Sequence, residues 1–123
     1  MKSLASIPVV RLKKRADFVR LRQRGGKAVT KGFILQYLAQ PELKEVRVGF
    51  TATKKMAKSA VVRNRAKRRL KAVVDAVMRL NPNFKCAPTD ICLIARYSTC
   101  DVPFDKMVKD LKRVLKADVG AEL

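Results

Sequence analysis

The stretch KKMAKSAVVRNRAKRRLK, residues 54–71, dominates the sequence because nine of its eighteen residues are Lys or Arg and none is Asp or Glu. From Val62 onward, apolar residues recur every three or four positions, in this stretch and in the residues that follow it. Such spacing is typical of a helix that buries one stripe. We therefore expect one helix here, with its cations on the remaining sides and its end at Asn81-Pro82-Asn83. The apolar stripe is Val62, Ala66, Leu70, Val73, Val77 and Leu80.

The cations of this helix have few acidic neighbours, since no Asp or Glu occurs between Glu45 and Asp75. Like charges one turn apart destabilise a helix by roughly 0.2–0.5 kcal/mol per pair. A solvated helix face usually alternates the sign of its charges, and this one does not. We interpret the helix as a surface that binds a polyanion, most simply a nucleic acid.

The overall charge supports that interpretation. The chain has 123 residues, a net charge of +19 and 48% hydrophobic residues, which indicates one folded domain over residues 1–123 with a large excess of positive charge. Such an excess is typical of proteins that bind phosphate backbones. Residues 1–74 hold 21 basic and 3 acidic residues, whereas residues 75–123 hold 8 and 7, so we expect the second part to be scaffold.

The cysteines and the N-terminal segment indicate a cytoplasmic protein. Cys86, Cys92 and Cys100 form no C-x-x-C pair, and no histidine is present to complete a zinc site. We expect free thiols in a reducing compartment. Residues 1–10, MKSLASIPVV, are too short an apolar run for a secretory signal or a membrane span. We expect them to be a flexible segment, and we expect no contact with a membrane.

Hydrophobic periodicity predicts the other elements. A helix over residues 11–27 should end at Gly25 and Gly26 in the left-handed conformation, and strands are expected at 32–39, 46–53 and 90–96, the last one buried on both faces. Asp101 should cap a final helix whose apolar stripe runs through Phe104, Met107, Val108, Leu111, Val114 and Leu115. We expect two or three strands before the basic helix. Taking three, the order of the elements is α-β-β-β-α-β-α. The fold class is α+β, a small mixed sheet packed with helices.

The strand at 46–53 has two different faces. Val46, Val48 and Phe50 should point into the core, while Arg47, Gly49 and Thr51 point the other way. The second face carries a small residue, a hydroxyl group and a cation. It either admits an extended polymer or is an ordinary solvated sheet face.

Catalytic chemistry is not evident in this sequence. Histidine is absent, and we find no H-E-x-x-H motif, D-x-D pair or P-loop. We therefore predict neither catalytic nor metal-binding residues. If the chain takes part in phosphodiester chemistry, another component must supply the metal ligands.

Residues 61–70, VVRNRAKRRL, following FTATKKMAK, resemble the R-N-R region of the bacterial ribonuclease P protein subunit. Further matches occur in the family's order over roughly residues 11–117. They are D-F at 17–18, FIL at 33–35, R-V-G-F at 47–50, K-K at 54–55 and I-A-R at 94–96.

The resemblance implies a ribonucleoprotein endoribonuclease that removes the 5′ leader from precursor tRNA. In such an enzyme the RNA performs hydrolysis with bound Mg²⁺, and the protein assists substrate and metal binding. The resemblance also implies a left-handed β-α-β crossover around the basic helix, and we expect a monomer apart from RNA. The implied contacts with the catalytic RNA are Lys54, Lys55, Arg63, Asn64, Arg65, Lys67, Arg68 and Lys71. The implied cleft for the leader, between the first helix and the sheet, contains Phe18, Arg22, Ile34, Gln36, Thr51 and Ala95.

Two positions depart from the family pattern. Arg22 and Gln36 stand where aromatic residues are common, and Tyr37 is displaced to the opposite face. The chain should therefore hold a leader more by charge than by stacking. The alternative function is a basic ribosomal or structural RNA-binding protein without a part in catalysis. A DNA-binding regulator reading the major groove through residues 60–72 is disfavoured, because this helix is cationic on every side outside its apolar stripe.

Overall fold

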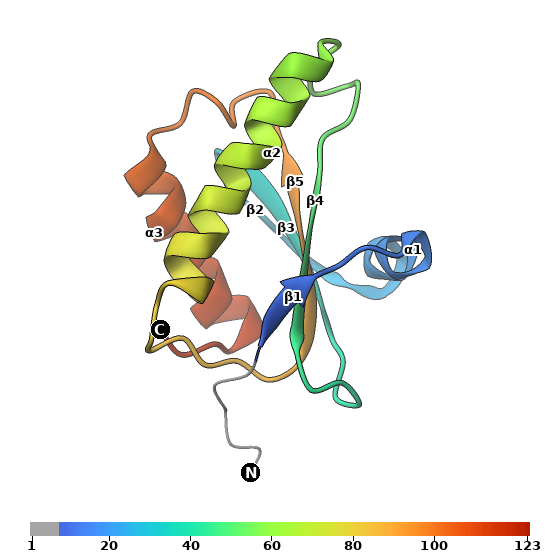
Figure 1. The fold of residues 1–123 in the computed structure, drawn as a ribbon, viewed down its shortest axis with the longest axis vertical. Coiled ribbons are helices and arrows are strands. Elements are labelled where there is room, and N and C mark those ends of the chain that lie inside the picture. The colour runs from blue at the N-terminus through green and yellow to red at the C-terminus, as the bar shows by residue number, and fades with distance from the viewer. Residues whose placement is uncertain (1–7) are drawn as a thin grey trace.

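The computed structural model describes residues 8–123 and shows a sheet with helices on both faces (Figure 1). Helices α2 and α3 cover one face, and α1 lies on the other. The elements are β1 (Val9–Arg11), α1 (Arg15–Arg24), β2 (Gly26–Val29), β3 (Phe33–Ala39), β4 (Val46–Thr51), α2 (Ala60–Val74), the π-helical turn η1 (Asp75–Arg79), β5 (Thr89–Ala95), α3 (Phe104–Val114) and the π-helical turn η2 (Leu115–Val119).

The strands form one mixed sheet in the order β1-β4-β5-β3-β2. Strand β4 is parallel to both β1 and β5, whereas β3 is antiparallel to both β5 and β2. The predicted α+β class is confirmed. Helix α2 connects the parallel neighbours β4 and β5, which is the position of the expected crossover, and the left hand of that crossover stays a prediction.

Strand β1 was not expected. Val9 pairs with Val46 and Arg11 with Val48, so Val9 and Val10 belong to the sheet and their assignment to a flexible segment is wrong. Without β1 the polar backbone groups along that side of β4 would lack strand partners. Residues 1–7, the remainder of that expected segment, lie outside the described residues.

The main core lies between the sheet and the layer of α2 and α3. Alternate residues of three strands point into it, and β5, between β4 and β3, is buried along most of its length as predicted. On α3 the predicted stripe is buried at four of its six positions, while Phe104 is 38% exposed. The strand residues of this core include Phe33, Leu35, Val46, Val48, Ile91 and Leu93.

The basic helix begins later than expected. Residues 54–56 form a turn, and α2 starts after Ser59, whose hydroxyl oxygen accepts a hydrogen bond from the Val62 backbone N–H at 3.4 Å. Serine in an extended conformation is a favourable N-cap because it satisfies one of the free N–H groups of the first turn. The prediction of one continuous helix from residue 54 is therefore wrong.

The far end of the basic helix widens into η1. There the Leu80 N–H bonds to the carbonyl of Asp75, five residues earlier, at 2.8 Å. This wider turn shifts the register of the side chains. Met78 is buried instead, and Leu80 is 77% exposed, so the prediction that Leu80 ends the apolar stripe is wrong.

Both predicted helix caps differ from the structure. Gly25 has φ of −77°, not a left-handed value. Glycine is needed there for close approach, because a Cβ atom would lie 2.6 Å from the Leu21 carbonyl oxygen and 2.7 Å from that of Tyr37. At α3 the N-cap position is Pro103, and Asp101 lies in the preceding turn, so its assignment as cap is also wrong.

Candidate nucleic-acid interface

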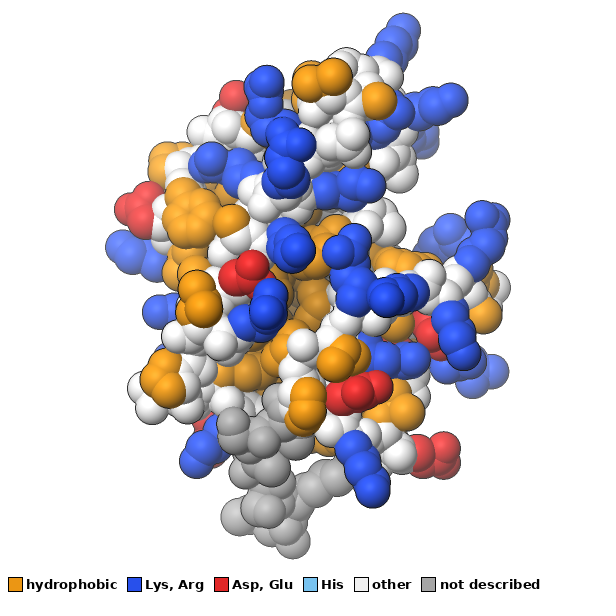
Figure 2. All heavy atoms as spheres, viewed as in Figure 1, with side chains coloured by type: hydrophobic (Ala, Val, Ile, Leu, Met, Phe, Trp, Pro, Cys, Tyr) orange, Lys and Arg blue, Asp and Glu red, His pale blue; other side chains and the backbone are white. Residues whose placement is uncertain are grey.

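Helix α2 carries six basic residues and no acid. Within residues 8–123, none of the six forms an ion pair with a carboxylate. Figure 2 shows Lys and Arg side chains gathered over α2. Their charge is therefore available to an external anion. The six are Arg63, Arg65, Lys67, Arg68, Arg69 and Lys71.

Two of these cations are partly occupied by the protein itself. The Arg63 guanidinium donates to the carbonyl oxygens of Ala57 at 2.9 Å and Lys58 at 2.7 Å, which ties the preceding turn to the helix. Arg69 donates to the carbonyl of Val102 in the turn before α3. Arg63 was predicted to contact RNA, and the structure gives it a structural role as well.

The remaining predicted RNA-contact residues are accessible. Asn64, Arg65, Arg68 and Lys71 are exposed and Lys67 is half-buried on α2. The other two predicted contacts, Lys54 and Lys55, are exposed on the turn that precedes α2, beyond the end of β4. The structure thus brings six of the eight predicted residues, Arg63 included, together on one helix and adds two from the adjoining turn.

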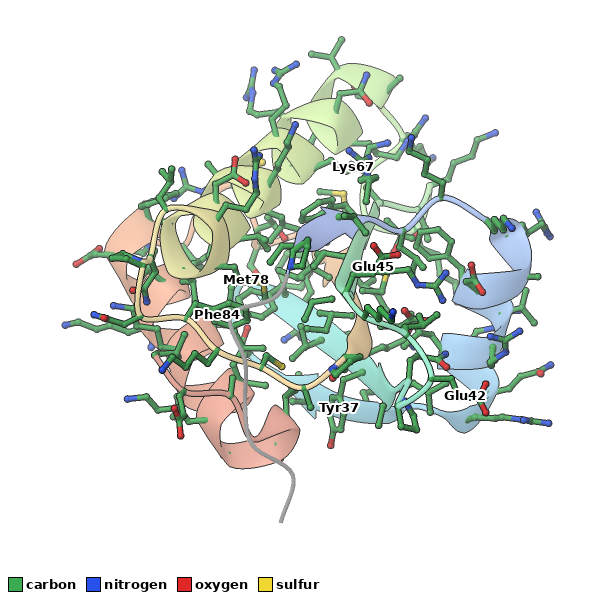
Figure 3. The ribbon with its side chains drawn as sticks, turned by 60° about the horizontal axis from the view of Figure 1, so that its bottom comes forward. Tyr37, Glu42, Glu45, Lys67, Met78 and Phe84 are labelled. Atoms are coloured by element: carbon green, nitrogen blue, oxygen red, sulfur yellow. The ribbon has the colours of Figure 1, made fainter. Side chains whose placement is uncertain are left out.

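A groove separates α2 from the sheet edge at β1. In Figure 2 hydrophobic atoms are visible in the hollow between α2 and β1, and in Figure 3 the labelled Lys67 lies where α2 faces β1. The Arg11 guanidinium carbon lies 5.4 Å from the centroid of the Phe50 ring, within the range of a cation–π contact. The residues lining this part of the groove are Arg11, Phe50, Asn64, Lys67, Arg68 and Lys71.

Sequence reasoning missed Arg11 and Phe50 as site residues. Phe50 was correctly expected on the core face of its strand, and it is half-buried there. Arg11 belongs to β1, an element that was not predicted. The alternation of β4 predicted which face of the sheet Phe50 lies on. Arg11 reaches the Phe50 ring only because β1 pairs with β4.

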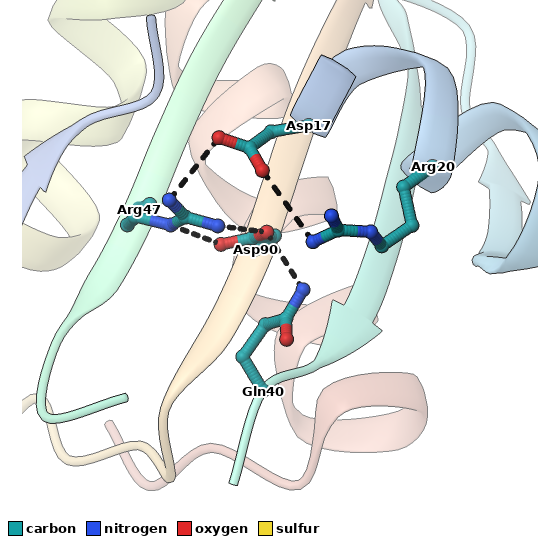
Figure 4. Close-up of polar contacts among 5 residues, drawn as sticks. All are labelled: Asp17, Arg20, Gln40, Arg47 and Asp90. Atoms are coloured by element: carbon teal, nitrogen blue, oxygen red, sulfur yellow. Dashed lines mark hydrogen bonds and ion pairs between the residues drawn. The ribbon is translucent and has the colours of Figure 1, made fainter. Parts of the chain in front are cut away.

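On the other face of the sheet, the cation of β4 is paired. Arg47 donates to both carboxylate oxygens of Asp90, at 2.7 and 2.6 Å, and to Asp17 of α1 at 3.2 Å (Figure 4). Arg20 contacts Asp17 at 3.4 Å, and Gln40 donates to Asp90 at 3.0 Å. The hydrogen bonds that Arg47 donates to Asp90, together with the charges of both carboxylates, raise the pKa of Arg47 against the opposing effect of burial. Arg47 therefore fastens α1 to the sheet, and the expectation of an open cationic face at this position is wrong.

Five of the six predicted leader residues lie on α1 or on the sheet face that α1 covers in part. Phe18 packs over Gly49, where a Cβ atom would lie 2.5 Å from the ring, and Arg22 is exposed one turn further along α1. Ile34, Gln36 and Thr51 are half-buried on this face of the sheet. These five residues form a strip beside α1 that contains apolar, polar and cationic side chains.

Ala95 does not belong to this strip. It is 5% exposed and lies in the main core, on the opposite face of the sheet. Adjacent residues of a strand point to opposite faces, and the half-buried Ile94 is the neighbour that faces α1. The prediction that Ala95 contacts a leader is wrong.

The three cysteines are free. Cys92 lies beneath α1 with Leu12 and Leu21, and burial raises the pKa of its thiol to about 11, against a hydrogen bond with Thr51 that lowers it. Burial also raises the pKa of the Cys86 thiol. Both thiols are therefore protonated, and weakly reactive, at neutral pH.

Residues 8–123 contain neither a cluster of metal ligands nor a helix that could cross a membrane. No three His, Cys, Asp or Glu residues in this part of the chain are grouped as metal ligands. Among its helices, none is both long enough and apolar enough to cross a membrane.

Comparison with known proteins identifies the family. The sequence model of the family described as Ribonuclease P matches residues 8–118. The ribonuclease P protein component of Gluconacetobacter diazotrophicus is 45% identical over 114 residues, covering 91% of this chain and 95% of that protein. The corresponding protein of Bacillus velezensis is 36% identical and covers 86% of each chain.

Solved structures of similar fold support the same family. The Staphylococcus aureus RNase P protein is similar with a TM-score of 0.69 and 29% identity, covering 89% of this chain and 95% of that one. The Thermotoga maritima RNase P protein shares the fold, with a TM-score of 0.68 and 23% identity over 86% of this chain and 94% of that one. A chain whose sequence matches the family model over most of its length, and whose sheet and helices match those structures, belongs to the ribonuclease P protein family.

Proposed function

We propose that this chain is the protein subunit of a ribonuclease P that removes the 5′ leader from precursor tRNA, with the RNA subunit performing the hydrolysis. The observation that carries the proposal is the set of cations on α2 that have no carboxylate partner within residues 8–123. A folded protein retains such a surface at a cost in self-repulsion. Docking on a structured RNA removes that cost.

The docking surface in this proposal is α2 with the turn before it. Each Lys or Arg that neutralises a phosphate releases condensed counterions, which gives binding energy that falls steeply with salt. Arg65, Lys67, Arg68 and Lys71 supply these contacts, because no carboxylate of residues 8–123 pairs with their charged groups. Lys54 and Lys55 extend the surface, and Asn64 can both donate and accept a hydrogen bond to a base or sugar.

The leader site in this proposal is the strip beside α1. Phe18 is half-buried with its ring packed on Gly49, and Ile34 and Thr51 form a half-buried floor. Arg22 and Gln36 take the place of the aromatic residues that are common in the family, so phosphate contact contributes more than stacking. This strip holds the single-stranded leader while α2 holds the RNA subunit.

Magnesium ions in this proposal are bound by RNA phosphates. The described residues do not fit a magnesium site of their own, since Asp17 and Asp90 are already bound by Arg47 and no other acids join them. The protein assists metal binding indirectly, by fixing the RNA and the leader in the arrangement that the ions stabilise.

Reconstitution tests the proposal. Purified protein is added to a bacterial ribonuclease P RNA, and cleavage of a precursor tRNA with a 5′ leader is measured across a Mg²⁺ titration. We expect the protein to lower the Mg²⁺ concentration needed for cleavage. If cleavage is unchanged at every Mg²⁺ concentration, although the protein binds the RNA, the chain is an RNA-binding protein without a part in catalysis.

A further inference from the structure

We infer that the groove between α2 and β1 receives one unpaired nucleotide of RNA, with its base against Phe50 and Arg11 and its phosphates on the cations of α2. The inference rests on the proposed function and adds a site to it. The groove lies on the opposite side of the sheet from the strip beside α1, so it is distinct from the proposed leader site.

The floor of the groove suits a base. Phe50 is half-buried with its ring fixed against the core, and Arg11 lies over that ring at 5.4 Å. Unstacked RNA bases stack on aromatic side chains and on the planes of arginine guanidinium groups. Arg11 is exposed and lines the groove together with Phe50, so a base can enter beside it.

The walls of the groove suit a phosphate backbone. Lys67, Arg68 and Lys71 lie one turn or less apart on α2, and no acid of residues 8–123 lines this part of the groove. Asn64, at its end, carries both a donor and an acceptor for the edge of a base. The adjoining part of the hollow, further along β1, does contain an acid, Asp75. Asp75 is paired with Arg79 at 3.3 Å.

An anion with a flat apolar part is therefore the occupant that matches both floor and walls. A continuous RNA duplex does not, because its bases are stacked inside the helix and only its backbone could reach the lysines. A bulge or loop with a single unstacked base matches both. An acidic peptide would match the walls but would leave Phe50 and Arg11 without a stacking partner.

Two RNA hairpins of identical stem test the inference, one with a single bulged adenosine and one fully paired. Binding of the full chain is measured by fluorescence anisotropy with labelled hairpins. We expect about tenfold tighter binding of the bulged hairpin, within the range known for stacking of one base on an aromatic side chain. Arg11→Gln and Phe50→Leu should each reduce this preference to nearly one. The matched control is Arg24→Gln, an exposed arginine of α1 that loses the same charge and should keep the preference.

Equal affinity of the wild-type protein for the two hairpins would overturn the inference, and so would a preference that survives Arg11→Gln. Arg11 is exposed, so this variant keeps the test valid if Phe50→Leu unfolds, which thermal melting reveals. Displacement of the bulged hairpin by hexaglutamate at equal concentration would make the groove a peptide site and also overturn the inference. None of these results changes the reconstituted Mg²⁺ titration, which decides the proposed function separately.

Discussion

On the α1 side of the sheet, Arg47 is held by two carboxylates, whereas on α2, Arg65 and Arg68 meet no carboxylate within residues 8–123. The two groups differ in burial as well as pairing. Asp90 has a side chain that is 1% exposed, so its charge depends on Arg47, while Arg65 and Arg68 are exposed. The same residue type therefore holds the fold together in one region and remains available for binding in the other.

The largest expected effect on stability comes from removing Arg47 from its two carboxylate partners. Arg47→Met leaves Asp90 buried without its cation, and removing one partner of a buried ion pair costs about 3 kcal/mol. The matched change Arg68→Met should alter stability by no more than about 0.5 kcal/mol, because exposed substitutions rarely do more. Urea denaturation of both variants measures the difference. Equal stability of the two proteins would mean that the contacts of Arg47 do not support the fold.

A smaller effect distinguishes two arginines of the same helix. Arg63→Ala should lower the free energy of unfolding by about 1 kcal/mol, since it removes two hydrogen bonds to the carbonyls of Ala57 and Lys58. Arg65→Ala, two residues along, removes no such bond and should leave stability unchanged. The same denaturation experiment compares them. A loss at Arg65 as large as that at Arg63 would contradict the division between structural and available cations.

The smallest effect concerns the strip beside α1. Arg22→Phe places an aromatic ring one turn after Phe18 and removes one phosphate contact, so the logarithmic salt slope of leader binding should fall by about 0.7. Affinity of the reconstituted enzyme for precursor tRNA with and without a leader, at several salt concentrations, measures this slope. Gln23→Phe, at the neighbouring exposed position, serves as control. An unchanged slope in Arg22→Phe would show that Arg22 does not contact the leader.

The features predicted from sequence are those that depend on neighbouring residues. The apolar stripe of α2 and η1 as far as Val77, the alternation of β4 and the burial of β5 all follow from local periodicity, and the arrangement agrees with the family resemblance. The charge excess pointed to α2 for the same reason, because its cations lack acids nearby in the sequence.

The features missed depend on distant residues or on single hydrogen bonds. Asp90 is 43 residues from Arg47, so no local pattern reveals their contact. Arg11 reaches Phe50 only because β1 pairs with β4, and a three-residue strand carries almost no periodicity. The start of α2 is set by the side chain of Ser59, and the exposure of Leu80 by one wider turn at Asp75.

The most direct test of the difference between the two kinds of cation is the salt dependence of binding to a ribonuclease P RNA. One variant carries Arg65→Gln, Arg68→Gln and Lys71→Gln on α2, and its control carries Lys109→Gln, Lys112→Gln and Lys116→Gln, exposed positions of α3 and η2, with the same loss of charge. We predict that the α2 variant binds more weakly and that its logarithmic salt slope falls by about 2 to 3, as expected for three lost phosphate contacts. The control should keep the wild-type slope, and equal losses in the two variants would contradict the assignment of α2 as the RNA-binding surface.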